Sequence, residues 1–100
     1  MARSKSYRLH PLAWLEIEGA DDWYRQRSPQ ASRDFVAEVF NAIETIREAP
    51  HRWPEHLHGT RRLILERFPF SVVYFDAAEF VNIVAVAHNK RKLGYWKRRL

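Results

Sequence analysis

The stretch Phe80–Trp96, FVNIVAVAHNKRKLGYW, passes from the most apolar run of the chain into its most basic one. Its first part, Phe80–Ala87, contains no glycine or proline and is rich in β-branched side chains. That length and composition are typical of a strand covered on both faces. We therefore expect this strand to lie inside a sheet and to deliver the polar residues that follow it to one sheet end.

The residues behind this strand combine an imidazole, several cations and a phenol. They are His88, Lys90, Arg91, Lys92, Tyr95, Lys97, Arg98 and Arg99, with Trp96 among them. An aromatic side chain in a terminal segment commonly anchors that segment to the core, and we predict this role for Trp96. Tyr95 has two open interpretations, as a second anchor or as a platform on which bases stack.

Two amphipathic helices with a short connection are predicted in the first half of the chain. The first runs from Leu12 to about Arg27, and the second runs from Pro29 to Pro50, because proline disfavours helix in the residue before it. Ser28 supplies a start signal, since its hydroxyl can cap free amides just before a proline with a preset φ. We expect an antiparallel helical hairpin. Its predicted buried residues include Ile17, Phe35, Val39 and Ile46.

The remaining elements are predicted to be strands. Residues 7–11 alternate apolar and polar side chains, whereas residues 50–60 show no period and form a loop. Residues 61–67 and 70–75 then lead by short turns into the opening strand, which predicts an antiparallel meander. The order β-α-α-β-β-β predicts an α+β fold: an antiparallel sheet with the helical hairpin on one face and a basic C-terminal tail. We expect residues 1–100 to form a single domain.

The formal charge of +5 is concentrated in the second half of the chain. Residues 56–100 hold nine Lys or Arg against three Asp or Glu, whereas residues 1–55 hold eight against nine. This excess suggests an anionic partner, either nucleic acid or an acidic protein segment. The absence of cysteine excludes disulfides and favours a reducing compartment. Without an apolar run of membrane-span length or a secretion signal, we expect a cytoplasmic protein with no membrane contact.

Three histidines, His51, His56 and His58, lie close to Glu55 in the predicted loop. Their spacing matches no standard zinc site, and Pro54 interrupts the group. We therefore predict a solvent-exposed loop, with no metal and no cofactor.

In this order and at this length, the chain resembles the RelE/ParE superfamily of bacterial type II toxins, in particular the ParE-like branch often labelled plasmid stabilisation proteins. The resemblance covers nearly the whole chain. It is carried by Asp22-Trp23-Tyr24, Ser28-Pro29, Arg61-Arg62-Leu63-Ile64-Leu65, Arg67-Phe68-Pro69-Phe70, Val73-Tyr74, Ala85-Val86-Ala87-His88, Arg91 and Tyr95-Trp96. It implies a growth-arresting toxin that a cognate antitoxin, encoded beside it, neutralises.

Members of the superfamily divide by target, and two targets remain open here. The ParE-like segments imply binding of DNA gyrase, which we favour, and the alternative is ribosome-dependent cleavage of mRNA. A plain nucleic-acid-binding module is a third hypothesis. Two departures from the cleaving members disfavour cleavage, because Ser71 stands about where they often carry an arginine and Ile64 where some carry a second lysine.

Cleavage of RNA by its own 2'-hydroxyl would need a base, a cation and an acid around the phosphate. The candidate catalytic residues are His88, Arg91, Tyr95 and Arg62. The competing interpretation of His88 is a packing or capping residue at the strand end. The candidates for contact with nucleic acid or with an acidic antitoxin segment are Arg61, Arg67, Lys90, Lys92, Lys97, Arg98 and Arg99.

Overall fold

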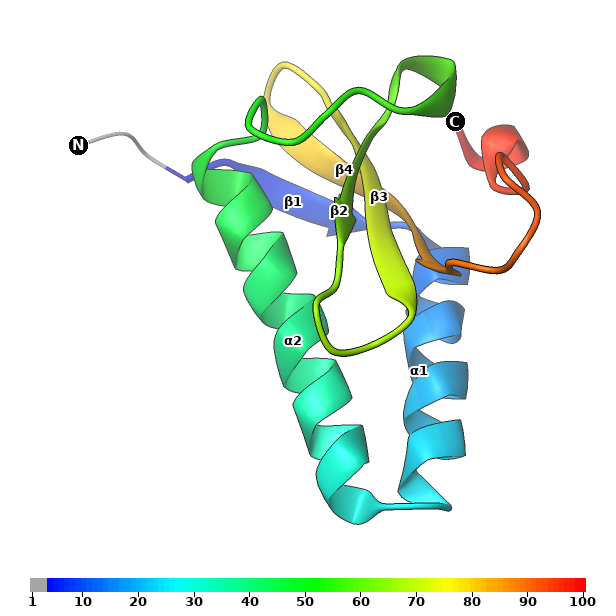
Figure 1. The fold of residues 1–100 in the computed structure, drawn as a ribbon. Coiled ribbons are helices and arrows are strands. Elements are labelled where there is room, and N and C mark those ends of the chain that lie inside the picture. The colour runs from blue at the N-terminus through cyan, green and yellow to red at the C-terminus, as the bar shows by residue number, and fades with distance from the viewer. Residues whose placement is uncertain (1–3) are drawn as a thin grey trace.

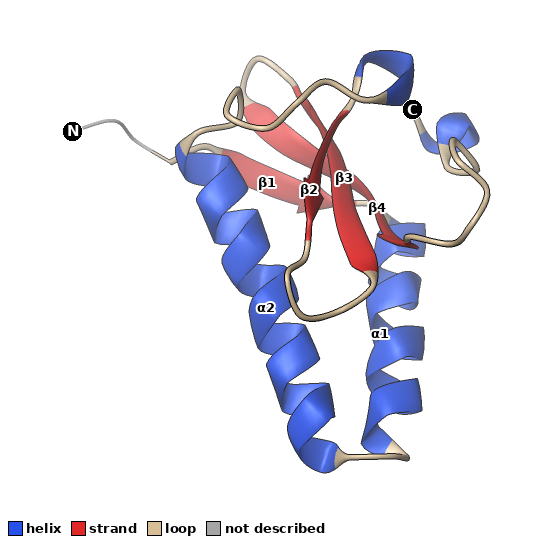
Figure 2. Cartoon of the chain, in the orientation of Figure 1, coloured by secondary structure: helices blue, strands red, loops and turns tan. Residues whose placement is uncertain are grey.

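The computed structural model describes residues 4–100 and has an α+β fold. Its elements are β1 (Ser6–Leu9), α1 (Pro11–Arg25), α2 (Pro29–Glu48), β2 (Arg61–Ile64), β3 (Phe70–Asp76) and β4 (Phe80–His88), as Figure 1 shows. Short 3₁₀ turns occur at Leu57–Gly59 and Lys97–Arg99. The two helices form a hairpin on one face of the sheet, so the predicted architecture is confirmed (Figure 2).

The sheet has the strand order β1-β4-β3-β2, which places β4 inside it as predicted. The meander is also confirmed, because β2 pairs with β3 and β3 with β4 in the antiparallel sense. The expectation of a wholly antiparallel sheet is corrected by β1, which runs parallel to β4 with Ser6 opposite Phe80 and Leu9 opposite Ile83. Apolar alternation fixes which face of a short edge strand is buried but says nothing about its direction.

A bulge in β4 determines which face His88 occupies. Val73 pairs with Ala85 while Tyr74 pairs with Ile83, so Val84 is an extra residue. A bulge interrupts the alternation of side chains along a strand. Ile83 packs toward the helices before the bulge, and after it Val86 rather than Ala85 or Ala87 does so. His88, two residues further on, therefore lies on the helix face.

The helix face holds the larger core. The predicted buried residues Ile17, Phe35, Val39 and Ile46 are all buried there. The predicted cap is also confirmed, because the Ser28 Oγ accepts a hydrogen bond from the Ala31 amide at 3.2 Å. The first helix begins slightly earlier than predicted, at Pro11.

The strand predicted over residues 61–67 is shorter than expected and ends at Ile64. Beyond it, the Glu38 carboxylate of α2 accepts hydrogen bonds from the backbone amides of Glu66 at 2.8 Å and Arg67 at 3.3 Å. These bonds satisfy amides that a longer ladder would have used, so the chain turns here into the β2–β3 connection.

The other face of the sheet, the tail face, is covered by the loop of residues 50–60 and by the C-terminal tail, residues 91–99. Trp96 is only 2% exposed and packs with Val73, Val84, Ala85 and Ala87, so its predicted role as an anchor is confirmed. The rings of His56 and His58 lie against Trp96, each with a centroid distance of 5.9 Å. Part of the loop predicted to face solvent thus packs on the C-terminal tail. Within residues 4–100, neither helix is long and apolar enough to cross a membrane.

Candidate functional site

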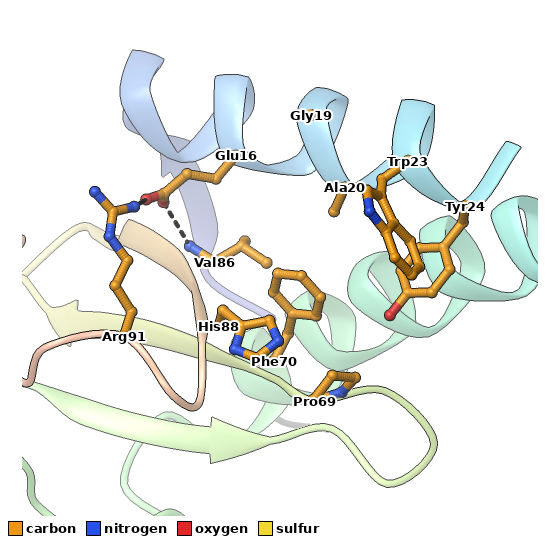
Figure 3. Close-up of a pocket in the computed structure, with 10 residues that line it drawn as sticks. All are labelled: Glu16, Gly19, Ala20, Trp23, Tyr24, Pro69, Phe70, Val86, His88 and Arg91. Atoms are coloured by element: carbon orange, nitrogen blue, oxygen red, sulfur yellow. Dashed lines mark hydrogen bonds and ion pairs between the residues drawn. The ribbon is translucent and has the colours of Figure 1, made fainter. Parts of the chain in front are cut away.

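A groove of about 500 Å³ lies between α1 and the adjoining ends of β3 and β4. Glu16 and Arg91 lie at one end of it, and Trp23 and Tyr24 lie at the other (Figure 3). The helix side is open because Gly19 carries no side chain, and a methyl group built there would touch nothing within 4 Å. The groove therefore has space for side chains from a partner.

A row of exposed apolar side chains on α1 extends this groove. Leu12 is 45% exposed, Leu15 is 58% exposed and Trp23 is 52% exposed. With Gly19 they follow helical spacing, so they share one side of α1. Large apolar side chains gathered on one surface mark an interaction site. The same row carries a cation, because the Arg27 guanidinium lies 3.7 Å from the centre of the Trp23 ring.

The carboxylate of Glu16 joins α1 to β4 and to the C-terminal tail. It accepts hydrogen bonds from the Val86 amide at 3.1 Å and from the Tyr95 hydroxyl at 2.5 Å. It also forms ion pairs with Arg99 at 2.9 Å and with Arg91 at 3.3 Å. The Glu16 side chain is only 14% exposed, so these contacts are weakly screened by solvent.

Tyr95 is held as a neutral phenol by this cluster. Burial raises the pKa of Tyr95, and the hydrogen bond to Glu16 and the negative charge of that carboxylate raise it further. The Arg91 guanidinium lies over the Tyr95 ring at 3.7 Å. The hydroxyl of Tyr95 and both guanidiniums are thus engaged within the protein itself.

The four candidate catalytic residues line a second, narrow cleft on the tail side of the sheet. It encloses about 20 Å³, which is room for about one water molecule, so a phosphodiester could lie only at its open mouth. The His88 ring packs against Phe70 of the helix face, with centroids 5.0 Å apart, and its Nδ1 accepts from the Lys90 amide at 3.1 Å. Arg62 stands opposite Val73, whose side chain belongs to the other face. The structure therefore joins Arg91 and Tyr95 at Glu16, whereas His88 and Arg62 border the same cleft with side chains from opposite faces of the sheet.

The remaining basic residues divide into paired and unpaired groups. Arg61 donates to the Trp53 carbonyl at 2.7 Å, and Arg67 pairs with Glu38 at 3.1 Å, so both are used within the fold. Of the candidate catalytic and contact cations, five make no ion pair with any residue that the structure describes. They are Arg62, Lys90, Lys92, Lys97 and Arg98. Four of them follow β4 in sequence: Lys90 and Lys92 come directly after the strand, and Lys97 and Arg98 lie in the C-terminal 3₁₀ turn.

Sequence reasoning missed Glu16 and assigned His56 only to a solvent-exposed loop. Glu16 carried a usable signal, because a charged residue at the helical spacing of Ala13 and Ala20 interrupts an apolar stripe. His56 carried none, since its surroundings depend on how an irregular loop meets the tail. Burial lowers the pKa of His56, and the positive charge of Arg62 and then of His58 add to that effect.

The sequence and the fold were compared with known proteins. The family described as ParE toxin of type II toxin-antitoxin system, parDE, matches residues 7–93. A solved structure described as a chromosomal ParDE TA system from P. aeruginosa is similar in fold, with a TM-score of 0.75 over 87% of this chain and 98% of that chain. The two chains are 19% identical, a level at which the likeness concerns the fold. No curated protein matches the sequence.

Proposed function

The chain belongs to the ParE toxin family of type II toxin–antitoxin systems, within the RelE/ParE superfamily, and on that premise we propose that it arrests growth by binding DNA gyrase. A cognate antitoxin neutralises it in the cytoplasm. Residues 1–100 act as one toxin domain, and the cations that follow β4, together with the C-terminal tail, contact the target.

The observation that supports binding over cleavage is the state of the candidate proton-transfer groups. The Tyr95 hydroxyl donates to Glu16 and has a raised pKa, so it is a poor proton donor to a leaving oxygen. His88 packs on Phe70, away from the face that carries Arg62. The cleft encloses only about 20 Å³, so it does not surround a scissile phosphate. Cations without ion pairs can bind a protein target without a proton donor and a base placed around a phosphate.

One observation favours the ribonuclease alternative. Arg62 makes no ion pair within residues 4–100, and it lies near His56, whose pKa is lowered. A neutral imidazole beside a free guanidinium is a possible base and phosphate ligand.

A paired assay distinguishes the two targets. Purified protein is added to a gyrase supercoiling reaction and to translating ribosomes that carry labelled mRNA, in each case as wild type and as His88→Gln. We expect both proteins to block supercoiling and to leave the mRNA intact. Cuts at codon positions made by wild type and reduced roughly 100- to 10,000-fold in His88→Gln would instead establish a ribonuclease.

We propose that the antitoxin places apolar side chains of an acidic amphipathic segment in the groove. The support is the apolar row of Leu12, Leu15 and Trp23 beside an open groove, with Arg91 at the groove's end. An apolar surface bordered by cations is complementary to such a segment.

The groove is tested by filling it at Gly19. Gly19→Phe places a ring in the open space, whereas the matched control Gly19→Ala adds only a methyl group that touches nothing. We expect Gly19→Phe to remain toxic and to bind the antitoxin about 30-fold more weakly, the size of a hot-spot contact. Equal neutralisation of both variants would place the antitoxin elsewhere.

A further inference from the structure

We propose that Glu16 is a positioning residue whose carboxylate fixes the C-terminal segment, residues 91–99, against α1 and β4. Its importance for toxicity rests on the proposed function, in which the tail contacts the target. The positioning itself stands on the geometry of this cluster and can be measured without any target.

The first argument is the balance of charge around Glu16. Arg91 and Arg99 both lie near the Tyr95 ring, at 3.7 and 5.2 Å from its centre, so the two cations are close to each other. Glu16 is the acid that pairs with both of them. Without its charge, the Arg99 guanidinium, which is only 11% exposed, would have no anion to balance it, and a charge left unpaired in a buried site is strongly unfavourable.

The second argument concerns the backbone of β4. β1 pairs with β4 only as far as Ile83, so the rest of β4 has no strand beside it on that side. Two side chains take the place of a strand there: Glu16 accepts from the Val86 amide, and Arg99 donates to the Val84 carbonyl at 3.1 Å. Buried backbone groups require such partners. Glu16 therefore binds the tail and the sheet edge with the same carboxylate.

The third argument is burial. Exposed ion pairs contribute little because solvent screens them and the side chains are mobile. Here the side chains of Glu16 and Arg99 are 14% and 11% exposed, and Arg99 makes two contacts with the carboxylate, at 2.9 and 3.1 Å. This pair is thus the most enclosed attachment of the tail apart from the Trp96 side chain.

The experiment compares Glu16→Gln with Glu18→Gln, a matched change of charge at an exposed position of the same helix. Glutamine keeps one acceptor oxygen, which can serve the Val86 amide, and removes the charge that holds both arginines. Limited trypsin digestion followed by mass spectrometry reports release of the tail at Lys97 and Arg98. We expect cleavage about tenfold faster in Glu16→Gln than in wild type, because cleavage follows the population of the open form.

A spectroscopic measurement accompanies the digestion. Absorbance at 295 nm follows the ionisation of the tyrosines, and we expect the pKa of Tyr95 to fall in Glu16→Gln because a neighbouring negative charge is removed. Comparison with Tyr95→Phe identifies which tyrosine has the shifted pKa. Loss of stability alone would not shift this titration in a folded protein. Glu18→Gln should leave both the digestion and the titration as in wild type.

If Glu16→Gln matches Glu18→Gln in both measurements, the inference is wrong, whatever the toxicity of either variant. If the tail loosens and gyrase inhibition persists unchanged, the positioning by Glu16 stands and the proposed contact of the tail with the target fails. Should Glu16→Gln fail to fold, a comparison of Arg99→Gln with and without Tyr95→Phe supplies the test. We expect their effects on tail cleavage to be non-additive, because both donate to one carboxylate; independent effects would overturn the inference.

Discussion

The two faces of the sheet are covered by different kinds of structure. The helix face is closed by two regular helices, whose stripes include Phe35 and Val39 at no measurable exposure. The tail face is closed by a loop and a tail, and its buried cluster is centred on the single side chain of Trp96. The helix face is therefore stabilised by many equivalent contacts, whereas the cover of the tail face depends on the Trp96 ring and the Glu16 carboxylate.

The largest expected effect tests the helix face. Phe35 lies within 5.5 Å of the ring centres of Tyr24, Phe68 and Phe70, so Phe35→Ala leaves a cavity among aromatic rings. We expect a loss of about 3 to 5 kcal/mol in the free energy of unfolding, measured by urea denaturation. A single transition in that experiment also checks the prediction of one domain. Wild-type stability in Phe35→Ala would contradict the description of this face.

The next effect tests the tail face. Trp96→Ala removes the ring that fills the cluster, but the loop and tail around it can collapse or admit water. We therefore expect a loss of about 3 kcal/mol or less, below that of Phe35→Ala in the same assay. Faster tryptic cleavage of the tail should accompany it. A loss larger than that of Phe35→Ala would reverse the comparison between the faces.

These two faces also differ in how far the sequence predicts them. Helical spacing and the Ser28 cap were sufficient to predict the hairpin and its buried residues, because both are local properties of the chain. The direction of β1 and the bulge at Val84 were not predictable, since each depends on which strand becomes a neighbour. Trp96 was predicted as an anchor from its type and place, but its contact with two histidines of the loop was not.

The candidate site follows the same division. Sequence identified the basic residues behind β4 but not that Glu16 engages two of them. Pairing between residues more than seventy positions apart leaves no periodic trace in a single sequence. The roles predicted for His88, Arg91, Tyr95 and Arg62 remain predictions.

A smaller effect on stability is expected when only helix α1 is changed. Gly19→Ala should stabilise the protein by up to about 1 kcal/mol, because alanine has the higher helix propensity and its methyl group meets no neighbour. The rate of tail cleavage should not change. Destabilisation would show that the open space at Gly19 is used within the fold.

The smallest expected effect is a pH dependence of the tail face. The pKa of His56 is lowered in the fold from its ordinary value of 6.5, so the unfolded chain binds this proton more tightly. The fold therefore favours neutral His56. The free energy of unfolding is highest above about pH 6.5 and decreases as the pH falls below that value and the histidine must bind a proton. Melting temperatures at pH 7.5 and pH 5.5 should differ less in His56→Gln than in wild type. If the melting temperatures of His56→Gln differ between the two pH values as much as those of wild type, the surroundings of His56 in the fold do not lower its pKa.

The bulge at Val84 has an evolutionary consequence. Because Val84 is the extra residue of the bulge, a relative that lacked it would keep Ile83 and Val86 on the helix face, and it would lose one buried valine from the cluster around Trp96. It would lose the carbonyl to which Arg99 donates. A Val84 deletion should therefore fold with its groove intact and show a tail more open to trypsin. A change of one residue at this bulge would therefore alter the attachment of the tail and leave the helix face as it is.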